Sequence, residues 1–233
     1  GVKDIGVILG PIKEGVIELL GDGSKFGAKI TYIDQPEPLG LAHAVMVSED
    51  FLRGETFVMY LGDNMLKQGA KPLVDIFEKK GSDCVIGVAK VKDPSRYGIV
   101  VFDKAKRIER LVEKPKEFVS EWALIGVYVF NDKIFDAVKR IRPSWRNELE
   151  ITDAIQVLLN DGAKVHVQFV KGWWKDTGRP EDLLEANQLI LHDLEPFNEG
   201  IIEEGATLTR LVGVGSNTVV HKDSTIRGPA ILG

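Results

Sequence analysis

The sequence predicts an α/β protein, a mostly parallel mixed sheet with helices on both faces, followed by a small repeat region. Two observations lead to this prediction. Up to residue 195, short runs rich in Val, Ile, Phe and Tyr alternate with longer runs of helical character. After Pro196 an aliphatic residue recurs every six positions instead. We therefore expect two domains, residues 1–195 and residues 196–233.

The first third of the chain has a βαβαβα pattern. Strands are expected at residues 5–9, 29–33 and 57–61, and helices at residues 11–20, 41–52 and 72–80. The helix at 72–80 has proline in its first turn and stops at Gly81, as helix ends prefer. This order is typical of a sheet covered by helices.

The next segment is richer in strands, which indicates an antiparallel insertion. Strands are expected at residues 84–91, 98–102, 108–112, 124–130 and 164–170, and helices at residues 132–141, 153–160 and 180–192. The helix at 153–160 is followed by Asp161-Gly162, a common helix end.

The repeat region has one large aliphatic and one smaller residue in each period. The large residues are Ile202, Leu208, Val214, Val220, Ile226 and Leu232, and Ala206, Val212, Thr218, Ser224 and Ala230 stand two positions before the last five. A six-residue period indicates a β-helix, because each short side needs one inward side chain. The array stops in mid-pattern at Gly233, so we expect the natural protein to continue.

Composition excludes several classes of protein. The net charge of −5 argues against a general nucleic-acid surface. No apolar run approaches the roughly 20 residues that span a bilayer, and no signal segment opens the chain. The single cysteine, Cys84, lies in an apolar strand and should be a buried, inert thiol. We expect a cytoplasmic homo-oligomer that binds neither nucleic acid nor membrane.

Gly62-Asp63-Asn64 directly follows the apolar run at 57–61. A buried strand that ends on Gly-Asp delivers a carboxylate to the sheet edge where α/β folds bind ligands and metal-bound phosphates. All three residue types also favour turns, so these residues alone leave a simple turn open as well.

Six short motifs occur at the expected strand ends. They are residues 35–44 (QPEPLGLAHA), 62–64 (GDN), 97–98 (YG), 112–115 (VEKP), 148–153 (ELEITD) and 174–178 (WKDTG). In this order and spacing they resemble the sugar-1-phosphate nucleotidylyltransferases, in the long form that carries a left-handed β-helix. The resemblance covers essentially the whole chain and implies a Rossmann-like fold. It implies nucleotidyl transfer from a nucleoside triphosphate to a sugar 1-phosphate with release of pyrophosphate, and dTTP and glucose 1-phosphate as the expected substrates.

The resemblance also assigns roles at the reacting groups. Asp63 and Asp176 would hold Mg²⁺, which suits a phosphoryl centre bound by one or two carboxylates. Lys114 would contact the sugar phosphate as a compact cation, and Glu113 would accept hydrogen bonds from sugar hydroxyls. A surface ion pair between Glu113 and Lys114 is disfavoured, because neighbours on an extended strand face opposite ways.

Further residues are assigned to the substrates. Gln35 would meet the edge of the pyrimidine base, and Gly40 would allow close backbone approach. The sugar pocket would be lined by the backbones of Tyr97, Gly98, Ile125 and Gly126, with Glu150 and Thr152 on its far side. Trp174 would be a further substrate-binding residue. Tyr97 and Trp174 fit a core aromatic role equally well. His43 stands where we expect glutamine in thymidylyltransferases, and it is interpreted as a helix-face residue.

The chain departs from the family in one respect. Members begin with a strand and a glycine-rich loop carrying Arg and Lys around the triphosphate, and these residues have no counterpart here. We therefore expect a fragment without turnover of its own. Alternatives are a UTP-dependent sugar-1-phosphate uridylyltransferase, with or without an acetyltransferase β-helix, and a non-catalytic regulatory relative.

Overall fold

The structure is a computed structural model that describes residues 2–52 and 54–233. The chain divides into two compact units, described separately below. The first comprises the residues up to 62 together with 68–171, and the second comprises 63–67 with 172–233. The second unit therefore contains some residues that precede the expected boundary at 195.

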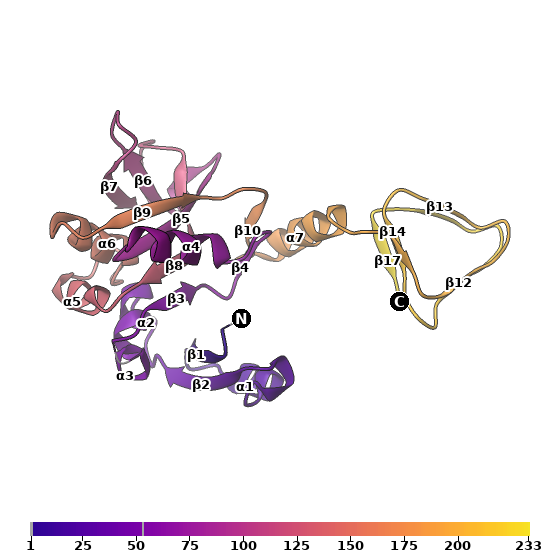
Figure 1. Cartoon of the computed structure of the whole chain (residues 1–233), viewed down its shortest axis with the longest axis horizontal. Helices are drawn as coiled ribbons and strands as arrows, with labels where there is room; N and C mark the ends of the chain where they lie inside the picture. Colours follow the sequence, from indigo (N-terminus) through magenta and orange to yellow (C-terminus); the bar gives the residue numbers. More distant parts are fainter. Residues whose placement is uncertain (1, 53) are drawn as a thin grey trace. The chain divides into compact units, whose positions relative to one another are not determined.

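The largest sheet among the described residues has six strands, all in the first unit (Figure 1). They are β3 (Phe57–Tyr60), β5 (Cys84–Lys90), β6 (Gly98–Phe102), β7 (Ile108–Glu113), β8 (Trp122–Phe130) and β9 (Val165–Phe169). Their order is β7-β6-β8-β5-β9, and β3 pairs with the end of β8. The predicted mixed sheet is confirmed.

The long strand β8 lies in the middle of this sheet. It runs antiparallel to β3, β5 and β6, while β5 and β9 are parallel. Strands β3, β5, β6 and β9 thus share one direction, as expected, yet most of the hydrogen-bonded pairs are antiparallel. The expected insertion is therefore central to the sheet.

Both faces of the sheet are covered, which explains its unbroken apolar strands. Cys84, Ile86 and Val88 of β5 pack in one buried cluster with side chains of α5 (Lys133–Arg140) and α6 (Ile151–Asn160). Helix α4 (Lys71–Lys80) packs against β5 and β9. Cys84 is fully buried, as predicted, and burial raises its pKa well above the usual range.

Several helix ends differ from the sequence expectations. The helix expected at 41–52 is divided into α2 (Leu41–Val47) and α3 (Glu49–Leu52), and the hydroxyl of Ser48 between them donates to Val45 O at 2.8 Å. Such a bond competes with the helical ladder. Helix α6 begins at Ile151, before the expected 153, so Thr152 lies in its first turn. Helix α4 ends at Gly81 with φ of 56°, as predicted.

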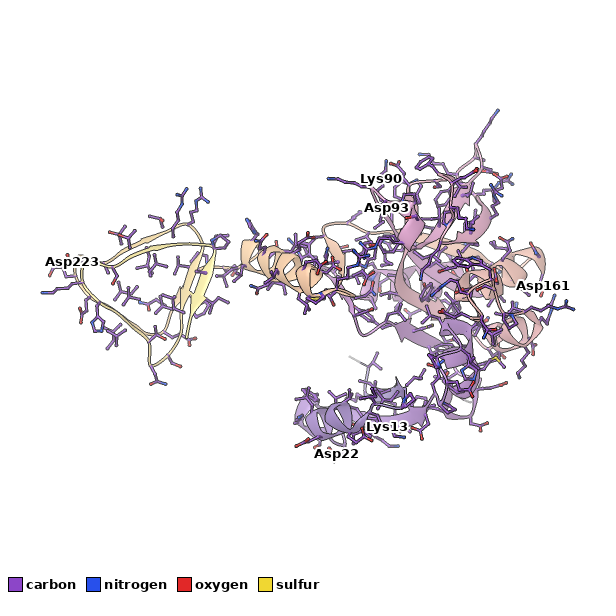
Figure 2. The ribbon with its side chains drawn as sticks, turned by 180° about the vertical axis from the view of Figure 1, so that it is seen from behind. Lys13, Asp22, Lys90, Asp93, Asp161 and Asp223 are labelled. Carbon is purple, nitrogen blue, oxygen red and sulfur yellow. The ribbon has the colours of Figure 1, made fainter. Side chains whose placement is uncertain are left out.

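The amino-terminal segment forms a separate two-stranded parallel sheet. Strands β1 (Asp4–Leu9) and β2 (Lys29–Asp34) are joined through α1 (Glu14–Leu20) and the 3₁₀ turn η1 (Ser24–Phe26). The helix was expected from residue 11, but it starts after Lys13 (Figure 2). The Lys13 ammonium pairs with the Asp34 carboxylate. A second 3₁₀ turn, η2 (Pro94–Arg96), precedes β6.

The second unit begins with a strand pair that the sequence reading missed. Strand β4 (Asn64–Leu66) pairs antiparallel with β10 (Trp174–Asp176), and helix α7 (Pro180–His192) follows. Seven short strands complete the unit: β11 (Phe197–Asn198), β12 (Ile201–Ile202), β13 (Thr207–Thr209), β14 (Val212–Val214), β15 (Val219–Val220), β16 (Thr225–Arg227) and β17 (Ala230–Leu232).

These short strands form three parallel ladders, β11-β14-β17, β12-β15 and β13-β16 (Figure 1). Each aliphatic residue of the six-residue period aligns with the third one after it: Ile202 with Val220, Leu208 with Ile226, and Val214 with Leu232. Val212, Val214 and Val220 are buried, and Leu208 and Ile226 pack against them. The period therefore gives this region a small core of its own.

In the stretches 2–52 and 54–233, none of the helices is both long and apolar enough to cross a membrane.

Candidate functional site

Glu113 is the centre of a half-buried cluster of polar side chains in the first unit, here called the polar cluster. It is the last residue of β7, where its Oε2 accepts a 3.1 Å hydrogen bond from the hydroxyl of Thr152. Gly98 pairs with Glu113 across the β6–β7 ladder. A Cβ on Gly98 would lie 2.6 Å from Thr152 Cγ2 and 3.0 Å from Glu113 Oε2, so this position requires glycine. Three of the predicted sugar-site residues are thus brought together.

Glu150 and Glu113 both lie near the guanidinium group of Arg146. Its side chain is nearly buried, and Oε1 accepts from Ser144 Oγ at 2.7 Å and from Arg146 Nη1 at 3.3 Å. Arg146 also bonds Glu148 Oε1 at 2.7 Å and lies 3.7 Å from Glu113 Oε1. Arg146 therefore holds three carboxylates in place.

Sequence reasoning missed Arg146. The available signal was its position four residues before Glu150, a spacing at which opposite charges meet on a helical turn. The residues from 144 to 148 are not helical, however, so the spacing works here through a turn.

The surroundings of Glu113 in the polar cluster favour its protonated form more than exposure to water would. Burial and the negative charge of Glu150 raise the pKa of Glu113, and Thr152, Lys114 and Arg146 oppose the rise. Burial and Glu150 also raise the pKa of Asp153. Two neighbouring carboxylates in partly desolvated surroundings are typical of functional sites.

Tyr97 precedes β6 and Lys114 follows β7, so the two residues lie at the same end of the β6–β7 hairpin. The Lys114 N–H donates to Tyr97 O at 3.0 Å, and Lys114 has a positive φ of 38°, which is uncommon outside glycine. This bend interrupts the strand alternation that separates neighbouring side chains. The positive charge of Lys114 consequently acts on Glu113. Strained backbone of this kind tends to occur at functional positions.

Ile125 and Gly126 lie within β8 rather than at a strand end. The Ile125 side chain is fully buried and fills the space that a Cβ on Gly87 would need. Gly126 has φ of 68°, and its carbonyl accepts from Leu61 N at 3.0 Å. Any contact with a ligand here must therefore come from the backbone, as the resemblance implies.

Gln35 and Gly40, in the loop after β2, lie close to His43 in the first turn of α2. The Gln35 amide nitrogen lies 3.1 Å from Gly40 O and 3.1 Å from His43 Nδ1. His43, interpreted from sequence as a simple helix-face residue, thus has a specific partner. Gly40 has φ of 100°, and a Cβ there would lie 2.6 Å from Leu149 O. The close approach at Gly40 is therefore to the Leu149 backbone, which joins this loop to the segment carrying Glu150.

Asp63 and Asp176 belong to the second unit, on neighbouring segments of the β4–β10 pair. Asp176 aligns with Asn64 in this ladder, and Thr177 donates to Asp63 O through both N and Oγ1, each at 2.8 Å. Asp63 lies in the turn before β4, so it is both a turn residue and a strand-end acid. The pairing brings together two acids that are far apart in the sequence.

A side-chain amide and a backbone N–H orient these acids. Asn64 Nδ2 donates to Asp63 Oδ1 at 2.8 Å, and Gly178 N donates to Asp176 Oδ1 at 3.0 Å. Trp174 Nε1 donates to Asn64 Oδ1 at 2.6 Å, so Trp174 supports the Asp63 side of the pair. The predicted part of Trp174 in substrate binding stays a prediction.

The donor set of Asp63 and Asp176 fits a magnesium ion. Hard oxygen ligands from one or two carboxylates, completed by waters and substrate phosphates, are what Mg²⁺ prefers. Across residues 2–52 and 54–233 no group of three or more His, Cys, Asp or Glu side chains forms a metal site, so a site here would need ligands from substrate or water.

The sequence profile of the nucleotidyl transferase family matches residues 1–193. The chain is 50% identical over 209 residues to the low-salt glycan biosynthesis nucleotidyltransferase Agl11 of Haloferax volcanii, covering 89% of this chain and 58% of that protein. It is 45% identical to the glucose-1-phosphate thymidylyltransferase of Streptomyces antibioticus, covering 100% of this chain and 65% of that protein.

Solved structures agree with this assignment. A Bacillus anthracis structure described as a glucose-1-phosphate thymidylyltransferase in complex with sucrose has a TM-score of 0.73 and 35% identity, covering 80% of this chain and 76% of that chain. A UDP-glucose pyrophosphorylase complexed with UDP-glucose shares the fold, with a TM-score of 0.71 at 21% identity, covering 82% of this chain and 81% of that chain.

This chain belongs to the nucleotidyl transferase family and has the mixed α/β, Rossmann-like fold of nucleotide-sugar transferases. It spans 58% to 65% of the length of the two curated relatives named above. The recognition made from the six motifs is confirmed.

Proposed function

We propose that the protein transfers a nucleotidyl group from a nucleoside triphosphate to a sugar 1-phosphate and releases pyrophosphate. The observation that supports the proposal is the polar cluster of Glu113, Thr152, Gly98 and Glu150 beside Lys114. It offers carboxylate acceptors for sugar hydroxyls and a cation for the phosphate of the same ligand. Names of the relatives support dTTP and glucose 1-phosphate as the substrate pair.

The residues position the reactants. Glu113 accepts hydrogen bonds from sugar hydroxyls, Thr152 holds its Oε2, and Lys114 offsets the charge of the sugar phosphate. A phosphate oxygen of the sugar phosphate then forms a bond to the α-phosphorus, and the bond from that phosphorus to the bridging oxygen of pyrophosphate breaks. Positioning and charge neutralisation are the main requirements of such a transfer.

Asp63 and Asp176 would hold Mg²⁺, which when bound neutralises phosphate charge and orients the triphosphate. The hydrogen bonds from Asn64 and Gly178 fix one oxygen of each carboxylate. The β4–β10 pairing places the two acids on adjacent segments. This arrangement supports a shared role for the two acids.

For the remaining substrate contacts, we propose the roles implied by the resemblance. Gln35 and Gly40 face the base, while the backbones of Tyr97, Gly98, Ile125 and Gly126 line the sugar, with Glu150 and Thr152 on its far side. UTP is the alternative nucleotide. Turnover with dTTP and UTP at equal concentration separates the two, and a preference of tenfold or more for UTP would replace the thymidylyl assignment.

The organisation of the whole protein is also proposed. Residues 1–195 act as the catalytic domain, and 196–233 begin a left-handed β-helix, which the three parallel ladders and their aligned aliphatic residues support. We propose a cytoplasmic homo-oligomer. Sedimentation of the natural protein at several concentrations tests the oligomer, and a monomer at all of them would contradict it.

The direct test is magnesium-dependent release of pyrophosphate from dTTP and glucose 1-phosphate, using the chain with whatever residues precede and follow it in the natural protein. We expect turnover that requires both substrates and is lost in Asp176→Asn. Asp223→Asn, an exposed acid in the repeat region, is the matched control (Figure 2). A folded, nucleotide-binding protein without turnover would support the non-catalytic alternative.

A further inference from the structure

The side chain of Gln35 is held in one orientation by two acceptors. Its amide nitrogen lies 3.1 Å from the carbonyl oxygen of Gly40 and 3.1 Å from Nδ1 of His43. A carbonyl oxygen can only accept, so the NH₂ end of the amide must face Gly40. The two amide hydrogens are then used by these two partners.

This orientation defines the protonation of His43. Because Nδ1 receives an amide hydrogen, the neutral imidazole carries its own proton on Nε2. His43 lies in the first turn of α2, which is fixed where Ala42 N donates to Leu149 O at 3.0 Å and Ala44 N donates to Gly40 O at 3.2 Å. The acceptor atom of His43 is therefore presented from a firm backbone.

The consequence concerns Gln35 Oε1. With both amide hydrogens engaged, the group that Gln35 can offer to a ligand is an acceptor and never a donor. Within residues 2–52 and 54–233, none of the recorded hydrogen bonds goes to this oxygen. An acceptor with no protein partner, half-buried after β2, suits a ligand that brings an N–H.

We propose that His43 is a positioning residue that locks Gln35 as an acceptor and thereby selects nucleotides whose base carries a ring N–H. This inference rests on the proposed function, in which Gln35 meets the base. Uracil and thymine have a hydrogen on N3, which Gln35 Oε1 accepts, whereas cytosine presents a lone pair at N3 and would face another lone pair. This arrangement weakens the binding of CTP and does not distinguish the binding of UTP from that of dTTP.

The test compares binding of UTP and CTP by calorimetry. In the wild-type chain we expect UTP to bind about tenfold more tightly, because one partner of a desolvated pair is otherwise left unmatched. His43→Phe keeps a ring but removes the acceptor, so the ratio should fall below about threefold. His43→Gln supplies an amide oxygen at this position and should restore the preference. His192→Phe, on α7, is the control for loss of a histidine.

A second measurement needs no nucleotide. In ¹⁵N NMR spectra of the wild-type chain, the His43 ring should show protonated Nε2 and unprotonated Nδ1, and the Gln35 side-chain NH₂ signals should move in His43→Phe. A proton on Nδ1, or an unchanged UTP to CTP ratio in His43→Phe, overturns the proposal. If nucleotide binding is too weak to measure, the ring spectrum decides.

The outcomes separate this inference from the proposed function. Pyrophosphate release with an unchanged ratio in His43→Phe would keep the function and overturn the role of His43. A ratio that depends on His43 without any pyrophosphate release would keep the role of His43 and overturn the function.

Discussion

The hydroxyl of Thr152, in the first turn of α6, donates a 3.1 Å hydrogen bond to Glu113 Oε2 at the end of β7. The two residues are distant in sequence, and both belong to the polar cluster. Thr152 is 1% exposed, so its bond to the carboxylate is shielded from water. This single contact couples the orientation of the sugar-binding acid to the start of a helix.

Replacing Thr152 by valine should remove that bond while keeping the side-chain shape. We expect a loss of about 1.5 to 3 kcal/mol in unfolding free energy, since a hydrogen bond to a charged group is lost. Affinity for glucose 1-phosphate should fall several-fold while affinity for the nucleotide is unchanged. Calorimetric titration of each ligand measures both. Thr152→Ser retains the hydroxyl, and an equal loss there would mean that packing rather than the hydrogen bond matters.

The raised pKa of Glu113 predicts a pH dependence of stability. Burial first, and Glu150 second, disfavour the ionised form in the folded state, so the folded pKa lies above the ordinary value of 4.5. The resulting stability is complete below that value and is lost as pH rises through the folded pKa. Urea unfolding between pH 4 and pH 7 should show this decline, and Glu113→Gln should flatten it. An equal slope in wild type and Glu113→Gln would exclude this explanation.

Removing Arg146 should expose the cost of the clustered acids. Its side chain is 22% exposed and pairs with Glu148 at 2.7 Å and Glu150 at 3.3 Å. Arg146→Met should lower the unfolding free energy by about 3 kcal/mol at pH 7, because buried charges lose their partner. The deficit should shrink at low pH as Glu113 takes up a proton. Arg140→Met, which breaks an exposed pair with Asp161, is the control and should change stability little. Equal losses in the two variants would contradict the special role of Arg146.

Gly98→Ala should disturb the polar cluster by steric overlap, without any change of charge. The added methyl would lie 2.6 Å from Thr152 Cγ2 and 3.0 Å from Leu124 Cδ1, both on buried residues. We expect a loss of about 1 to 3 kcal/mol in stability, typical of overpacking, together with weaker glucose 1-phosphate binding. Gly15→Ala, in helix α1 with open space around its Cβ, is the control and should be neutral or stabilising. Thermal unfolding of both variants decides the matter.

Asp63→Asn should separate the structural role of this residue from its chemical one. The backbone carbonyl of Asp63 holds Thr177 at 2.8 Å in either variant, so the β4–β10 pair should persist. Turnover should fall by about 100-fold or more, equivalent to roughly 3 kcal/mol of lost charge stabilisation. Magnesium titration of the rate measures this, and raising the Mg²⁺ concentration should recover part of it. An unchanged rate with an intact fold would show that Asp63 acts only in the turn.

Sequence alone determined the local elements and the chemistry of the motifs. Periodicity, proline at a helix start and glycine at a helix end predicted α4, β6 and α7 closely, because these signals act over a few residues. The six-residue aliphatic period likewise predicted which side chains of the repeat region stack, since its strands pair with near neighbours in the chain. The turn at Gly62-Asp63, which the sequence left open, was readable for the same reason.

Only the tertiary structure decided which distant residues meet. Three features depend on pairing between remote segments: the central antiparallel strand β8, the β4–β10 pair that joins the Asp63 and Asp176 segments, and the approach of Arg146 to Glu113. Such pairings are selected by global packing, and no local pattern encodes them. The Gln35–His43 bond is a short-range example of the same limit. Side-chain orientation, rather than residue type, made Gln35 an acceptor.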